Sequence, residues 1–174
     1  MRRIWNLTLA AALLAAALSG CSQPAAQESE TPSRTPEELT EAYQTAIESA
    51  RDDEMNEAVP VITASDQAMA DLVLPMLGIT NENTTAYAVA VSPMNVKAYG
   101  VAALMPAEGQ EDALLESVNA FVEQQKSAFT NYLPDQYEIA SAAKVETLDD
   151  GTILLVMCED QDTVLESIKT SLNG

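Results

Sequence analysis

The chain has 174 residues, with 27 Asp or Glu, 8 Lys or Arg and no His, which gives a formal net charge of −19 at pH 7. Nucleic acid and anionic lipid headgroups repel a surface this acidic. The lack of histidine excludes histidine-containing catalytic triads and histidine-based metal sites. The length suits one domain with a hydrophobic core and leaves no room for a second of similar size.

The first residues have the pattern of a secretory leader. Arg2 and Arg3 form a short positive segment, and residues 7–18 contain only Leu and Ala apart from Thr8. A charged start followed by a short apolar run is typical of a signal peptide. Since a membrane-spanning helix needs about 20 apolar residues, this run predicts a leader that is cleaved off.

Leu18, Ser19, Gly20 and Cys21 close the leader. This order resembles the lipobox of bacterial lipoproteins, in which the cysteine is lipidated and the chain is cut in front of it. The resemblance implies that residues 1–20 are a signal peptide, that signal peptidase recognises Leu18, Ser19 and Gly20, and that Cys21 carries a lipid such as palmitate. The alternative is an ordinary signal peptide with a chance cysteine.

Cys158 is the other of the two cysteines. If Cys21 is acylated, Cys158 has no intramolecular partner, so no internal disulfide framework is expected. Cys158 follows the apolar residues 153–157. This position favours a buried thiol at the end of a strand over a reactive nucleophile.

Residues 21–34 are expected to form a disordered tether. Positions 22–34 are rich in Ser, Pro and Glu and hold no large apolar side chain. The rest of the chain, residues 35–174, is expected to be a single α+β domain.

Two helices are predicted at the start of this domain. Residues 35–38, Thr-Pro-Glu-Glu, form a capping-box pattern, which predicts a helix from there to about Asp53. Its apolar stripe is expected to pack on the domain, with docking of a partner as the alternative. A second helix is predicted from Ser65 or Asp66 to about Gly78.

The pattern then predicts two successive strand-strand-helix units. Their strands and helices are expected at residues 84–91, 98–105, 110–133, 144–148 and 153–158, followed by a last helix that Asp160 caps. Residues 135–142 add one or two helical turns, and Asp149-Asp150-Gly151 is a hairpin turn. The predicted fold class is α+β, an antiparallel four-stranded sheet with the long helices packed on one face, preceded by two N-terminal helices.

Three segments carry a resemblance to a known family. They are Tyr87–Asn95, Gln124–Ser127 and Asn131–Tyr137. Together they resemble the domain of unknown function 4358 family, found in lipoproteins of clostridia-like Gram-positive bacteria, over about residues 65–172. The family has no assigned activity, so the resemblance implies no functional residue. The chain departs from the family pattern at Ala98–Gly100, where an acidic residue is common.

Two motifs have both a structural and a functional interpretation. The segment Asn131–Tyr137 is interpreted as a helix stop with two packed Tyr rings, with a binding lip as the alternative. The acidic run Glu159–Asp162 resembles a calcium loop but lacks the glycine at the sixth position and the glutamate at the twelfth. A solvated helix start is therefore favoured there, and no metal site or cofactor is predicted.

These observations predict a lipoprotein on the extracytoplasmic face of the cell membrane, held there by its lipid anchor. The missing catalytic residue types favour a non-enzymatic domain that binds an envelope protein partner. The alternatives are an extracytoplasmic enzyme that uses carboxylates or a cation, and a small-ligand carrier. A cation-dependent enzyme predicts that calcium or magnesium shifts the thermal melt, and a purely protein-binding domain predicts no shift.

Overall fold

The computed structural model describes residues 34–174. The predicted signal peptide, the lipobox Leu18–Cys21 and the predicted tether up to residue 33 lie outside the described residues. Residues Arg34–Gly174 cluster as one unit by their contacts.

A four-stranded antiparallel sheet lies at the centre of this unit. Its strands are β1 (Thr84–Val91), β2 (Gly100–Pro106), β3 (Lys144–Thr147) and β4 (Ile153–Met157), in the order β1-β2-β4-β3. Each predicted hairpin forms, and the two hairpins join through antiparallel pairing of β2 with β4. The predicted α+β class with an antiparallel four-stranded sheet is confirmed.

Six helices surround the sheet. They are α1 (Pro36–Ser49), α2 (Asp53–Ala58), α3 (Ala70–Met76), α4 (Glu111–Phe129), α5 (Pro134–Ser141) and α6 (Gln161–Leu172). None of these helices in residues 34–174 is long and apolar enough to cross a membrane. Three helices precede the sheet where two were predicted, because Asp52 starts a new helix, α2, by accepting a hydrogen bond from the Met55 backbone N–H at 2.7 Å.

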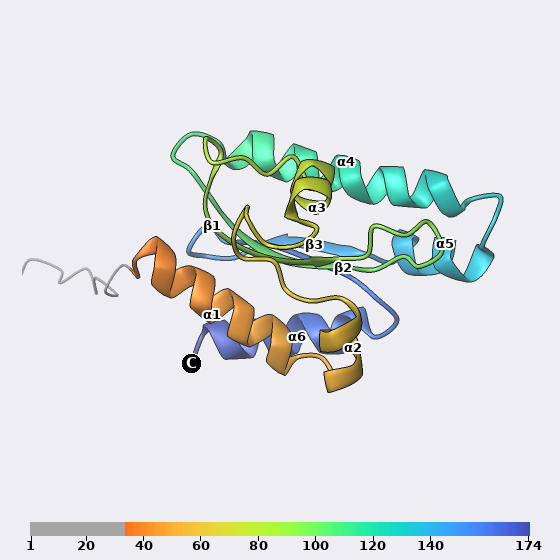
Figure 1. The fold of residues 1–174 in the computed structure, drawn as a ribbon, viewed down its shortest axis with the longest axis horizontal. Helices are drawn as coiled ribbons and strands as arrows, with labels where there is room; N and C mark the ends of the chain where they lie inside the picture. Colours follow the sequence, from red (N-terminus) through yellow and green to blue (C-terminus); the bar gives the residue numbers. More distant parts are fainter. Residues whose placement is uncertain (1–33) are drawn as a thin grey trace, which may run out of the picture. The chain divides into compact units, whose positions relative to one another are not determined.

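The predicted placement of the long helices on one face is wrong. Helices α3 and α4 cover one face of the sheet, and α1 and α6 cover the other (Figure 1). The physical reason is that both faces are apolar: all five residues of β4 are buried, and β1 alternates alanine with valine or tyrosine. A sheet that is apolar on both faces must be covered on both to keep those side chains from water.

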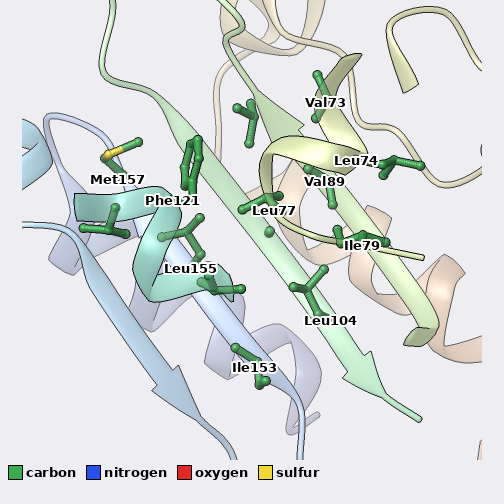
Figure 2. Packing of buried hydrophobic residues seen from close by; sticks show 14 of the residues in the cluster. Val73, Leu74, Leu77, Ile79, Val89, Leu104, Phe121, Ile153, Leu155 and Met157 are labelled. Atoms are coloured by element: carbon green, nitrogen blue, oxygen red, sulfur yellow. The ribbon is translucent and has the colours of Figure 1, made fainter. Parts of the chain in front are cut away.

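Two hydrophobic clusters result, one on each face. In the first, Phe121 of α4 lies beside Leu155 and Met157 of β4, and Leu77 and Ile79 cover β1 and β2 (Figure 2). In the second, α1 lies against small alanines of β1 and β2, and α6 packs on β4 and β3. These alanines let a helix lie close to the sheet.

The predicted start of α1 is confirmed. The Thr35 backbone N–H donates to Glu38 Oε2 at 2.8 Å, and the Glu38 N–H donates to Thr35 Oγ1 at 3.2 Å. Helix α1 ends at Ser49 instead of near Asp53, since α2 starts there. Its apolar stripe is buried, with Tyr43 and Ile47 in the second cluster, so the stripe packs on the domain as predicted.

Tyr43 provides a pH-dependent prediction. Its hydroxyl lies 2.7 Å from Thr152 Oγ1, and both residues are almost fully buried. Burial raises the pKa of Tyr43 to about 12. Because the folded state holds the phenol proton more tightly than the unfolded state, this contribution to stability is complete below pH 10 and is lost as the pH rises through about 12.

We therefore expect Tyr43→Phe to show a shallower fall in unfolding free energy than the wild type between pH 10 and 12. At neutral pH the variant should be less stable by about 1–2 kcal/mol, because Thr152 loses its partner. Urea unfolding across this pH range measures both effects. Tyr132→Phe, at an exposed residue, should keep the wild-type slope, and equal slopes for all three proteins would contradict the assignment to Tyr43.

Candidate functional site

Cys158 directly follows β4 and is buried among side chains of the second cluster, as predicted. It is a free thiol within residues 34–174. Burial raises the pKa of the Cys158 thiol; a hydrogen bond with the Asp160 backbone opposes this rise, and the negative charges of Asp160 and Glu159 add to it. Since the thiolate is the reactive form, the surroundings of Cys158 disfavour nucleophilic chemistry.

The acidic run Glu159–Asp162 leads into helix α6, as predicted. Asp160 occupies the N-cap position, but its side chain makes no capping hydrogen bond, so that detail of the prediction is wrong. Asp162 pairs with Lys144 Nζ at 3.1 Å across the exposed surface. In the described part of the chain, no three His, Cys, Asp or Glu side chains lie close enough together to hold a metal ion.

The aromatic turn between α4 and α5 differs from its prediction. Phe129 and Leu133 pack into the first cluster, whereas Tyr132 is 67% exposed and Tyr137 is 37% exposed. The prediction of two packed Tyr rings is therefore wrong. Phe129 and Leu133 already fill the core beside this turn, so the Tyr rings point to solvent.

The same turn contacts the β1–β2 connection. The side-chain Oε1 of Gln136 accepts a hydrogen bond of 2.8 Å from the Ala98 backbone N–H. The segment Asn131–Tyr137 therefore contacts the β1–β2 connection at Ala98, three residues after the segment Tyr87–Asn95, although 38 positions separate Ala98 from Gln136 in the chain. Gln136 fixes the base of the β1–β2 connection from the α5 side.

Gln136→Ala should lower the unfolding free energy by about 1 kcal/mol, because the Ala98 N–H loses its acceptor. It should also speed hydrogen exchange at the Ala98 amide, which residue-resolved NMR measures. Gln136→Glu keeps an oxygen acceptor and should retain most of the Ala98 protection. Equal exchange rates in the two variants would show that the hydrogen bond does not hold this connection.

An apolar groove lies beside the β1–β2 connection. It encloses about 450 Å³, and its walls come from residues 58–62, from residues 67–69 with Val73, and from residues 91–94. None of these lining residues is charged. Its two polar side chains, Gln67 and Ser92, make hydrogen bonds to the backbone of the groove walls or next to them. Gln67 Oε1 accepts from the Ala64 N–H at 2.8 Å, and Ser92 Oγ accepts from the Met94 N–H at 3.4 Å.

Two methionines flank the groove and remain open to solvent. Met69 is 48% exposed and Met94 is 62% exposed. Met69 is also the one residue other than glycine with a positive φ in residues 34–174, at 70°. A left-handed conformation costs a residue with a side chain about 1–2 kcal/mol, and such strain is concentrated at functional sites.

A small polar cluster supports one wall of the groove from the α1 side. Arg51 Nη1 donates to the Val59 carbonyl at 3.0 Å and to the Tyr99 hydroxyl at 3.3 Å. Lys97 Nζ lies 5.6 Å from the centre of the Tyr99 ring, and burial raises the pKa of Tyr99. Arg51 thus joins the end of α1 to residues 58–62, which form one wall of the groove.

The sequence alone did not reveal this groove. Its walls come from three separate segments, and each one resembles an ordinary connection when it is considered by itself. The available signals were the short extended run Val59–Ile62, followed by the two methionines next to connections. The predicted lipidation site Cys21 and its flanking Leu18, Ser19 and Gly20 lie outside the described residues, so the structure does not relate them to the groove.

Residues 34–174 thus form a small α+β domain with an apolar groove beside the β1–β2 connection. The chain belongs to the family described as Domain of unknown function (DUF4358), whose model matches residues 62–158. This match confirms the family resemblance, and it includes the groove walls from Ile62 to Met94. No curated protein and no solved structure matches the chain.

Proposed function

We propose that this protein is a lipoprotein on the extracytoplasmic face of the cell membrane and that its domain binds an envelope protein partner in the groove. The anchor is supported by the order of the leader, the small residues Ser19 and Gly20, and Cys21. The binding function rests on one observation, the uncharged groove with two exposed methionines.

The composition of the groove supports binding more than chemistry. Binding sites are concave and mostly apolar, with few polar groups. Exposed apolar side chains gathered at one place mark interaction surfaces, and methionine side chains adapt to the shape of a partner. No lining residue is Asp, Glu, His, Cys, Lys or Arg, so the groove holds no side chain of the kinds most used for proton transfer.

Crosslinking in intact cells followed by mass spectrometry tests the binding function. The double variant Met69→Asn/Met94→Asn should lose the crosslinked partner that the wild type recovers. Asn is chosen because it tolerates the left-handed conformation of residue 69. The matched control is Leu72→Asn, since Leu72 is 49% exposed but does not line the groove.

The control should recover the partner as the wild type does. Thermal melts of all variants verify that the domain remains folded. Recovery of the same proteins by the wild type and the double variant, or of random neighbours alone, would overturn the binding function.

Metabolic labelling tests the anchor separately. Labelled palmitate should enter the wild type and not Cys21→Ala, and the variant should leave the membrane fraction. Equal labelling of the two proteins would refute the anchor without bearing on the groove.

A further inference from the structure

The two methionines of the groove differ from the other methionines in their exposure to solvent. The chain has seven methionines, and Met1 lies outside the described residues. Met69 and Met94 are 48% and 62% exposed, whereas Met157 is 0% exposed. The remaining methionines are partly buried, namely Met55, Met76 and Met105. Within residues 34–174, the exposed methionines are therefore the two that line the groove.

Exposure decides which methionine side chains react with a peroxide. The thioether sulfur attacks one oxygen of hydrogen peroxide, and the O–O bond breaks. The attacked oxygen stays on the sulfur, and its proton passes to the departing hydroxide, which leaves as water. The sulfur loses two electrons and the peroxide gains them, so each sulfoxide consumes one peroxide molecule.

Cys158, the free thiol within residues 34–174, competes poorly for this oxidant. It is buried, and burial raises the pKa of its thiol. Because the thiolate is the form that peroxides oxidise, a buried and protonated thiol reacts slowly. The sulfur atoms of the described domain that are open to a peroxide are therefore those of Met69 and Met94.

An added oxygen would change the chemistry of the groove. A sulfoxide is polar, whereas the thioether is apolar. In the free protein, water can solvate an oxygen on either side chain, because both are exposed. A partner that covers the groove with apolar side chains would bury this oxygen without a hydrogen-bond donor, which disfavours binding. Oxidation is thus expected to weaken binding and to leave the domain folded.

We infer that Met69 and Met94 form an oxidation site that controls the groove: the thioethers bind the partner protein, and their conversion to sulfoxides by hydrogen peroxide releases it. The inference rests on the proposed binding function and adds its regulation. The site would make attachment of the partner depend on the peroxide around the protein.

Timed exposure of the full chain to hydrogen peroxide, followed by peptide mass spectrometry, tests the oxidation site without a partner. Met69 and Met94 should form sulfoxides about 10-fold faster than Met157, because reactivity follows exposure. In urea, where the domain is unfolded, the three rates should become similar. Equal rates in the folded protein would overturn the oxidation site. Thermal melts of the oxidised protein verify that it remains folded.

Crosslinking in intact cells, with and without hydrogen peroxide, tests the control of binding. The matched variant is Met69→Leu/Met94→Leu, since leucine keeps the apolar character and approximate size of methionine but has no sulfur. Peroxide should reduce the partner that the wild type recovers by about 10-fold, the effect of one buried polar group without a hydrogen bond. The leucine variant should recover the same amount before and after the treatment.

Two results would overturn the control of binding. One is undiminished recovery by a wild type in which mass spectrometry shows both sulfoxides. The other is an equal loss in the wild type and the leucine variant, because the partner's own methionines meet the same peroxide in both strains. A wild type that captures no partner even without peroxide would instead overturn the binding function and with it this control, whereas the oxidation rates judge the oxidation site separately.

Discussion

Phe121→Ala should lower the unfolding free energy by about 3–5 kcal/mol. The Phe121 ring is 1% exposed and fills the first cluster between α4 and the sheet (Figure 2). Its Cε1 lies 3.3 Å from the position that a Cβ on Gly100 would take, so the ring lies directly over β2. The helix cannot move closer to fill the space, because other buried side chains of α4, such as Leu114 and Val118, already contact the same cluster.

Urea unfolding monitored by circular dichroism measures this loss. Tyr132→Ala removes an aromatic ring of similar size from a site that is 67% exposed, and it should change stability by less than about 0.5 kcal/mol. Because small domains have a total stability of about 5–15 kcal/mol, Phe121→Ala is expected to leave the domain marginally folded. Similar losses in the two variants would contradict the assignment of Phe121 to the core.

Gly78→Ala should cost about 2–4 kcal/mol, for two separate reasons. Gly78 has a φ of +68°, and a Cβ there would lie 2.9 Å from both Cβ and Oγ of Ser117 on α4. Ser117 cannot turn aside freely, because its Oγ donates to the Ala113 carbonyl at 3.0 Å. The glycine thus lets the end of α3 contact α4 closely.

Gly109→Ala separates the two contributions. Gly109 has a φ of +76°, but no atom lies within 4 Å of the position that a Cβ would take there, so it should show only the conformational cost of about 1 kcal/mol. In a Ser117→Gly background, which lacks the Ser117 side chain, Gly78→Ala should lower the unfolding free energy only as much as Gly109→Ala does. If Gly78→Ala and Gly109→Ala are equally destabilising, the contact with Ser117 does not contribute.

Local patterns in the sequence predicted most of the secondary structure. The alternation of small and large apolar residues predicted the first hairpin, and the turn Asp149-Asp150-Gly151 before a continuous apolar run predicted the second. The capping box at Thr35 predicted the start of α1. The ends of helices were less predictable. Asp52 could equally have continued α1, and only its hydrogen bond to the Met55 N–H shows that it begins a new helix.

The faces that the helices cover could not be predicted in the same way. Each helix has one apolar stripe and each face of the sheet is apolar, so the pattern permits a helix on either side. The groove could not be predicted either. It forms only where three separate connections, which contain Pro60, Met69 and Met94, come together in the fold. The exposure of Tyr132 could not be predicted for the same reason, because it depends on which neighbouring side chains fill the core.

Helix α1 also sets the distance between the ends of this unit and the groove. Arg34, where residues 1–33 join, donates through Nη1 to the Leu172 carbonyl at 3.5 Å, so the two ends of the unit lie together. From there the 14 residues of α1 extend about 20 Å to Arg51 and the groove wall at Val59. A tag or fluorescent protein fused after Gly174 would thus emerge beside the incoming chain, about one helix length from the groove, and should leave it open to a partner.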